Sequence, residues 1–124
     1  MKLRLRENSI RLRLLQSEIE QLRQSGTVSE KIQFNERQTL TYTLKISAAA
    51  TEISSRFENA EIIVEIPLDA AREWMTTDLV GLENKQKING NLTLEITLEK
   101  DFACLDRPFD ADNRDAFPRP SQNC

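Results

Sequence analysis

Charged side chains of one sign gather on separate stretches of alternating sequence, and they are the residues best placed to bind a ligand. Clustered arginines can hold phosphate or carboxylate through pairs of parallel hydrogen bonds. Basic residues alternate with apolar ones near the N-terminus, and glutamates do so later in the chain. The candidate ligand-binding residues are Lys2, Arg4, Arg6, Arg11, Arg13, Glu65, Glu95 and Glu99.

Two interpretations of this charge pattern remain open. In the first, the side chains line a barrel lumen or a concave face and bind an anionic phosphate ligand. In the second, they lie on a solvated sheet face and pair across strands, each pair contributing about 0.2–1 kcal/mol. The second is favoured, because alternating charge is typical of any antiparallel sheet with one exposed face.

Catalytic chemistry has few candidates in this sequence. The absence of histidine excludes Ser-His-Asp and Cys-His catalysis and histidine-ligated metals. Cys104 is a candidate reactive thiol, since Lys100 and Arg107 would favour its thiolate, although the preceding Phe102 predicts burial. A bridge to Cys124 is possible, but two free thiols are expected in a reducing cytoplasm.

A calcium loop is suggested only superficially by the acidic run Asp110–Asp115. It lacks both the glycine at the sharp turn and the closing glutamate of an EF-hand loop. We therefore expect a solvated acidic segment there, and we expect no metal, no cofactor and no catalytic residue in the chain. Whether the protein is an enzyme stays open, with a non-enzyme favoured.

Alternation of period two predicts most of the secondary structure. It predicts strands at 3–5, 10–14, 40–46, 62–66 and 92–98, and weaker strands at 31–35, 49–57 and 79–87. Asn89-Gly90 predicts a hairpin, because both residue types tolerate positive φ.

Two short helices are expected between these strands. Ser17 resembles the first residue of a capping box and Gly26 a helix end, which predicts one helix over 17–24. Asp69 is expected to cap a second helix after Pro67, with Trp74 facing inward.

The two halves of the chain resemble each other when shifted by 52 positions. The shift carries Ile10 onto Ile62, Ser17 onto Asp69 and Leu40 onto Leu92, without a gap. We therefore expect an α+β fold built from a duplicated β-α-β-β(-β) unit, with pseudo-repeats at about 9–57 and 61–105. Its sheet would be largely antiparallel, either barrel-like or open and twisted, with two short helices.

Residues 1–105 are expected to form a single α+β domain, and 106–124 an irregular acidic tail that contains prolines. Three segments resemble a family of small uncharacterised bacterial proteins, a domain of unknown function. They are Asn8–Leu22, Glu99–Leu105 and Asp115–Pro118. This resemblance covers nearly the whole chain. It implies domain boundaries and no activity.

The order of the predicted elements is also similar to CYTH-type triphosphate tunnel proteins. That resemblance implies an antiparallel barrel that binds triphosphate with basic residues and a metal with acidic ones. The family signature is Glu-x-Glu-x-Lys on the first strand, where this sequence has Lys2-x-Arg4-x-Arg6-Glu7. The carboxylates of Glu95 and Glu99 are spaced differently, so the similarity is one of topology.

Composition limits the remaining function classes. The 124 residues are 39% hydrophobic and 30% charged, which is ordinary for a globular domain, and the net charge of −3 favours neither nucleic acid nor membrane. No apolar run reaches the roughly 20 residues of a membrane span, and Met1–Arg6 does not resemble a signal peptide. We expect a cytoplasmic protein.

The leading hypothesis is a small non-catalytic binding or protein-interaction domain. Its partner would be an unknown protein or a second copy bound through exposed strand edges. The alternative is a phosphate- or triphosphate-binding barrel, a degenerate phosphohydrolase. A third hypothesis is a thiol-based regulator that acts through Cys104.

Overall fold

The computed structural model describes residues 1–103 and 111–118, which form strands, one short helix in the middle of each half of the chain, and a third helix near the end. The strands are β1 (Lys2–Arg6), β2 (Ser9–Leu14), β3 (Thr27–Gln33), β4 (Thr39–Ser47), β5 (Ser54–Glu58), β6 (Glu61–Pro67), β7 (Gly81–Lys87) and β8 (Thr93–Lys100), and the helices are α1 (Gln16–Ser25), α2 (Leu68–Thr76) and α3 (Ala111–Asp115). The predicted α+β class and the strongly alternating strands are confirmed. Cys104, Arg107 and Cys124 lie outside the described residues.

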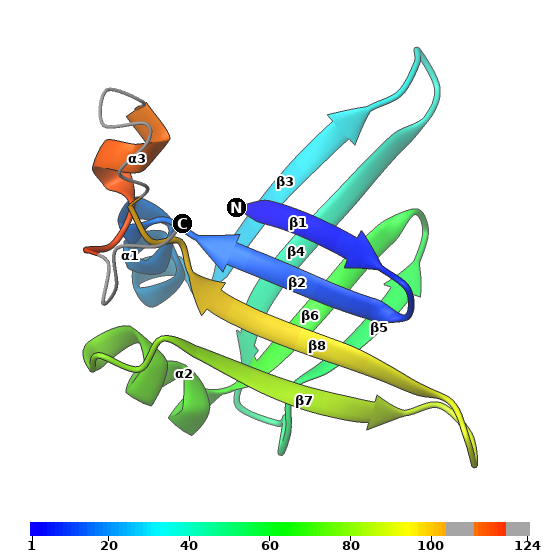
Figure 1. The fold of residues 1–124 in the computed structure, drawn as a ribbon. Coiled ribbons are helices and arrows are strands. Elements are labelled where there is room, and N and C mark those ends of the chain that lie inside the picture. Colours follow the sequence, from blue (N-terminus) through cyan, green and yellow to red (C-terminus); the bar gives the residue numbers. More distant parts are fainter. Residues whose placement is uncertain (104–110, 119–124) are drawn as a thin grey trace.

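The strands form two four-stranded sheets that cross face to face (Figure 1). Sheet A has the order β1-β2-β8-β7 and sheet B the order β3-β4-β6-β5. In each sheet the two outer pairs are antiparallel, and the central pairs, β2–β8 and β4–β6, are parallel. The sheets are therefore mostly antiparallel, as predicted. No strand ladder joins sheet A to sheet B within the described residues, so the possible barrel does not form.

Each half of the chain contributes one hairpin to each sheet. The first half is β1-β2-α1-β3-β4, and the second half repeats this order as β5-β6-α2-β7-β8. Sheet A combines the first hairpin of one half with the second hairpin of the other, and sheet B combines the remaining two. The repeat unit is thus β-β-α-β-β over 2–47 and 54–100. These bounds differ from the predicted 9–57 and 61–105, because in the element order β5 is the counterpart of β1.

The pairing registers of the two halves correspond. Adding 52 to both members turns the pair Lys2↔Arg13 into Ser54↔Glu65. Adding 54 turns Thr27↔Lys45 into Gly81↔Glu99. The ungapped shift of 52 is therefore right for the first hairpins and two residues short for the second. The error kept every side chain on its correct face, because side-chain direction in a strand repeats every two residues.

Equivalent turns in the two halves make equivalent hydrogen bonds. Asn35 Oδ1 accepts the amides of Arg37 and Gln38, and Asn89 Oδ1 accepts those of Asn91 and Leu92. The predicted hairpin at Asn89-Gly90 is thus confirmed. It forms without positive φ at either residue, because the Asn89 side chain closes the turn instead.

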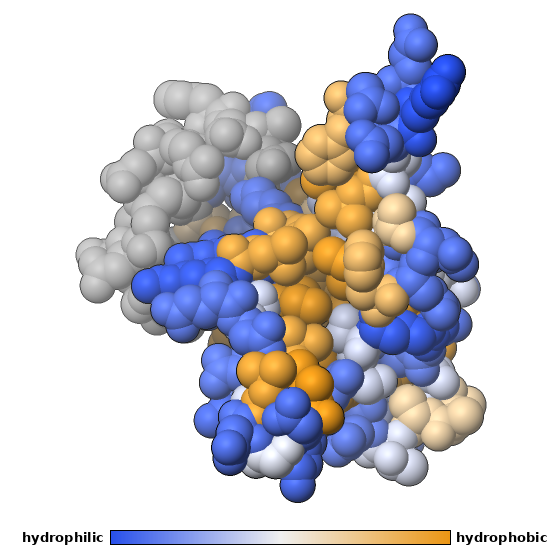
Figure 2. Space-filling view, turned by 90° about the vertical axis from the view of Figure 1, so that its right-hand side faces the viewer, coloured by the Kyte–Doolittle hydropathy of each residue, from blue (hydrophilic) through white to orange (hydrophobic). Residues whose placement is uncertain are grey.

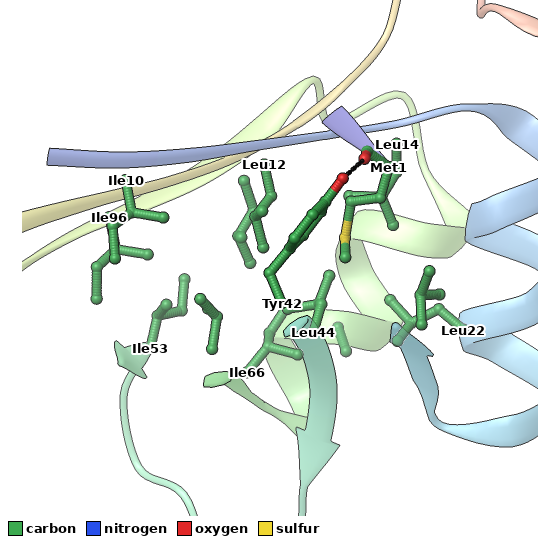
Figure 3. Packing of buried hydrophobic residues seen from close by; sticks show 14 of the residues in the cluster. Met1, Ile10, Leu12, Leu14, Leu22, Tyr42, Leu44, Ile53, Ile66 and Ile96 are labelled. Carbon is green, nitrogen blue, oxygen red and sulfur yellow. Dashed lines mark hydrogen bonds between the residues drawn. The ribbon is translucent and has the colours of Figure 1, made fainter. Parts of the chain in front are cut away.

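One hydrophobic core fills the space between the sheets and the helices. Leu12, Leu14, Leu44 and Ile66 from the inner sheet faces are fully buried, and Leu22 and Trp74 cover them from α1 and α2. Figure 3 shows the strand residues of this cluster around the Tyr42 ring. Both helices lie at one end of the sandwich, and the hairpin turns lie at the other (Figure 1).

The helices begin earlier than their predicted caps. α1 starts after Leu15, whose amide donates to Glu18 Oε1 at 2.9 Å, while Ser17 lies inside the first turn. α2 starts directly after Pro67, so Asp69 also lies inside the first turn. The predicted end of α1 is confirmed: Gly26 adopts φ 79° and its amide donates to Leu22 O at 2.8 Å.

Part of the segment expected to be irregular has regular structure. Within 111–118, α3 is followed by a bridge between Phe117 and Phe102. Asp115 accepts hydrogen bonds from the Ser17 amide and hydroxyl, so this carboxylate attaches the segment to α1. Among the described helices, none combines the length and the apolar character that a membrane crossing needs.

Trp74 gives a direct test of the shared core. Its side chain is fully buried, and Nε1 donates to Val80 O at 3.1 Å. Trp74→Ala should lower the free energy of unfolding by about 3–5 kcal/mol, because it leaves a large cavity and removes one of the two hydrogen bonds that Val80 O accepts. Urea denaturation followed by circular dichroism measures this change. Arg72→Ala, on the exposed side of the same helix, should change it by less than about 0.5 kcal/mol. A loss below about 1 kcal/mol for Trp74→Ala would contradict the packing.

Candidate ligand-binding face

The basic residues of β1 and β2 share the outward face of sheet A. Leu12 and its apolar neighbours on β2 point into the core, so the residues between them point away from it. In the register of the two strands, Lys2 lies opposite Arg13 and Arg4 lies opposite Arg11. Like charges directly opposite each other destabilise a sheet, so this face needs carboxylates or anions nearby.

Carboxylates from β8 and the residue after it neutralise part of this charge. Arg13 Nε lies 2.6 Å from Glu99 Oε1, and Arg11 Nε lies 3.6 Å from the same oxygen. Lys2 Nζ lies 2.8 Å from Asp101 Oδ2. That buried oxygen accepts no hydrogen bond from the described residues, so the contact with Lys2 is an ion pair without hydrogen-bond geometry.

Arg4 and Arg6 keep their charges unpaired. Neither guanidinium makes an ion pair or a hydrogen bond with any residue in the described part of the chain. They border a shallow, open pocket of about 110 Å³. Its lining residues are Arg4, Arg6, Ser9, Ile10, Arg11, Glu95 and Thr97.

The structure brings seven of the eight predicted ligand-binding residues onto this one face. Glu95 lies across the pocket and pairs with Lys85 at 3.8 Å. Glu65 does not belong to the group, since it lies on the outward face of sheet B beside Arg56 and Lys45. The face is exposed on the outside of the sandwich, so the interpretation that these residues line a lumen is wrong.

A second polar cluster closes the end of the core next to α1. The Met1 amino group hydrogen-bonds to the carboxylates of Glu18 and Glu30. The Tyr42 hydroxyl lies 2.8 Å from Met1 O (Figure 3). It also lies 3.0 Å from Glu30 Oε2. The Tyr42 ring packs in the core while its hydroxyl finds these polar partners. The alternating pattern gave no signal for the carboxylate of Glu30 at the same place.

The charges in this cluster stabilise each other. Burial alone would lower the pKa of the Met1 amino group, but hydrogen bonds to Glu18 and Glu30 outweigh it, so this pKa is raised. Burial would raise the pKa of Glu30, but the hydrogen bond and charge of the Met1 amino group, together with hydrogen bonds to Glu18 and Tyr42, outweigh it, so that pKa is lowered. Burial and the nearby Glu30 carboxylate raise the pKa of Tyr42 to about 12, so the phenol stays protonated.

No described residues gather as a metal centre: groups of three or more acidic or thiol side chains at metal-binding distance are absent from 1–103 and 111–118. Asp110 lies outside the described residues, and Asp115 bonds to Ser17. The environment of the candidate thiol Cys104 lies outside them too.

Sequence patterns missed an exposed apolar surface at the end of the sandwich opposite α1 and α2. Figure 2 shows apolar side chains along the middle of this end. Phe57 is 68% exposed, Phe34 66%, Leu5 58% and Ile88 50%. We call these four residues the apolar end. The available signal in the sequence was the presence of two aromatic residues, Phe34 and Phe57, beside hairpin turns.

This geometry defines a class of protein: an α+β sandwich of two sheets, each assembled from hairpins of two repeats. A family model described as a family of unknown function (DUF7009) matches residues 1–121, and the chain belongs to that family. No curated protein and no solved structure matches the chain. The resemblance to an uncharacterised family is therefore confirmed, while the similarity to triphosphate tunnel proteins has no support from these comparisons.

The Glu30 cluster predicts a stability plateau against pH. Glu30 has a lowered pKa, so its contribution is present above the unfolded value of 4.5 and is lost as pH falls through the folded pKa. Met1 has a raised pKa, so its contribution is present below the unfolded value of 8.0 and is lost as pH rises through the folded pKa. Stability from this pair should be greatest between these two values.

Glu30→Gln tests that plateau. It should lower the free energy of unfolding by about 1 kcal/mol near pH 6.5, a small value because the Glu30 side chain is 40% exposed. Denaturant melts at several pH values measure the difference, which should shrink at low pH as wild-type Glu30 becomes protonated. Glu52→Gln, an exposed residue between the repeats, is the control. A loss that stays constant below pH 4 would contradict the charge pairing.

Proposed function

We propose that this protein is a non-catalytic interaction domain whose apolar end binds a second copy of the chain. The observation that carries the proposal is the exposure of four large apolar side chains, Phe57, Phe34, Leu5 and Ile88, at or near the hairpin turns on the side away from α1 and α2 (Figure 1). Exposed large apolar side chains that occur together, and not singly, are typical of protein–protein contact sites. A cytoplasmic setting is part of the same proposal, where cysteines would stay reduced.

Internal symmetry favours a second copy as the occupant. Adding 52 relates Leu5 to Phe57, and adding 54 relates Phe34 to Ile88, so the apolar end contains two pairs of equivalent positions. A surface with this approximate twofold symmetry presents similar shape in both orientations. In a twofold dimer the same patch meets itself, so such a surface is well suited to self-association.

Charge around the apolar end also permits self-association. The exposed turns carry acidic Glu7 and Glu36 and basic Arg37, and exposed Lys87 is the last residue of β7. Both signs are present, so acidic groups of one copy can meet basic groups of the other.

The sequence predicted a contact through exposed strand edges, and one of the four edge strands, β5, is less suitable for it. At β5, the Gln86 side chain accepts the Ser55 amide at 2.6 Å and donates to Ser55 O at 3.0 Å. Asn84 Nδ2 donates to Ile53 O at 2.7 Å. These bonds occupy part of the backbone that an added strand would need.

Light scattering after size exclusion, over a range of concentrations, tests the proposal. The wild-type chain should show a concentration-dependent dimer. Phe57→Asp should raise the dissociation constant of this dimer at least about tenfold, because a charge would be buried in an apolar contact. Val80→Asp is the matched control, since Val80 is 44% exposed but lies outside the apolar end. A monomer at all concentrations, or equal effects of both variants, would overturn the proposal.

A further inference from the structure

The two repeats treat one arginine position in opposite ways. Arg4 and Arg56 are equivalent under the shift of 52 that relates β1 to β5. Arg56 Nε lies 3.0 Å from Glu58 Oε1, and its Nη1 hydrogen-bonds to Glu65. These two carboxylates contact the guanidinium and raise the pKa of Arg56, and the hydrogen bond to Glu65 has the larger effect.

Around Arg4, both of those carboxylates are replaced by arginines. The counterpart of Glu58 is Arg6, and the counterpart of Glu65 is Arg13. Arg13 is neutralised from β8 by Glu99, but Arg4 and Arg6 make no ion pair with the described residues. The second repeat shows that the same backbone accepts a neutralised arginine here, so the fold does not require the excess positive charge.

The excess is confined to one of two equivalent faces. The outward face of sheet A carries seven basic residues against three acidic ones, a sum of +4; they are Lys2, Arg4, Arg6, Arg11, Arg13, Lys85 and Lys87, and Glu83, Glu95 and Glu99. The outward face of sheet B carries three of each sign, Lys31, Lys45 and Arg56, and Glu58, Glu61 and Glu65. The whole chain has a net charge of −3, so sheet A presents a basic face on an acidic protein.

We propose that a phosphate group binds in the shallow pocket of sheet A. It would neutralise Arg4 there, as Glu58 and Glu65 neutralise Arg56 on sheet B. Arg4 and Arg6 would donate to its oxygens from β1, and Arg11 would donate from the neighbouring strand. Guanidinium forks match phosphate oxygens in pairs, and a doubly charged group balances two unpaired arginines. The site is independent of the proposed dimer, because it lies on an outward sheet face and not on the apolar end.

The small, open pocket favours a compact ligand with neighbouring phosphates. A pocket of about 110 Å³ holds one phosphate group, and a second group would lie over the exposed part of the face. Glu95 on the opposite wall repels anions, and its distance of 3.8 Å from Lys85 leaves it only weakly neutralised. Glu95 should therefore limit the affinity for phosphate. Removing its charge should strengthen binding, whereas removing an arginine should weaken it.

Calorimetric titration of the full chain with inorganic pyrophosphate at low ionic strength tests the site. Wild type should bind, and Arg4→Gln and Arg6→Gln should each weaken binding at least about tenfold. Glu95→Gln should strengthen it several-fold. Arg56→Gln, at the equivalent position of the other repeat, should leave it unchanged. Affinity should fall as salt is added.

Three results would overturn the inference. They are absence of binding to wild type, equal losses for Arg4→Gln and Arg56→Gln, or binding of citrate as tight as that of pyrophosphate, which would show a general anion surface. Thermal melts of each variant, unchanged from wild type, establish that a lost signal reflects the site and not the fold. Inorganic phosphate in a parallel titration should bind more weakly than pyrophosphate, and equal affinity would contradict the second contact.

Discussion

Parallel pairing of β2 with β8 and of β4 with β6 is the constraint on which the rest of the structure depends. These two pairs are where the halves of the chain share a hydrogen-bonded sheet. Neither half contains a complete sheet of its own, because its two hairpins lie in different layers. The connecting helices α1 and α2 must then lie at the same end, where they cover the core between the layers (Figure 1).

The exchange of hairpins also explains how one scaffold presents unlike surfaces. Inward positions are restricted by a common core, and equivalent residues there stay apolar, as with Leu12 and Val64 or Leu44 and Leu98. Outward positions carry no such restriction, because solvent accepts any polar side chain. Arg6 and Glu58 occupy equivalent outward positions with opposite charge. Differences between the repeats are therefore informative on the outside, where the fold itself makes no demand.

Sequence reasoning predicted local structure well and long-range arrangement poorly. The alternation of Leu40, Tyr42, Leu44 and Ile46 with polar residues predicted β4 and its buried face, because burial of one face has a direct signature in sequence. The assignment of hairpins to two sheets has no such signature, since it depends on which distant strand pairs with β2. The repeat boundary was displaced for the same reason, as β5 reads as an extension of the first half until its pairing with β6 is known.

The candidate site was likewise predicted in part. Seven charged residues of sheet A were identified from their period and charge, and the structure places them together. Glu65 was grouped with them wrongly, because its sequence pattern is the same on either sheet. The apolar end escaped notice because Leu5 and Phe57 occupy inward positions of their strands, which predicts burial, yet they lie where the sandwich opens.

Backbone amide nuclear Overhauser effects test the central claim, the exchange of hairpins, most directly. The account predicts cross-strand contacts in parallel register between Ile10 and Ile96 and between Leu44 and Val64. Contacts of β2 with β4 inside one half, in place of those with β8, would contradict it.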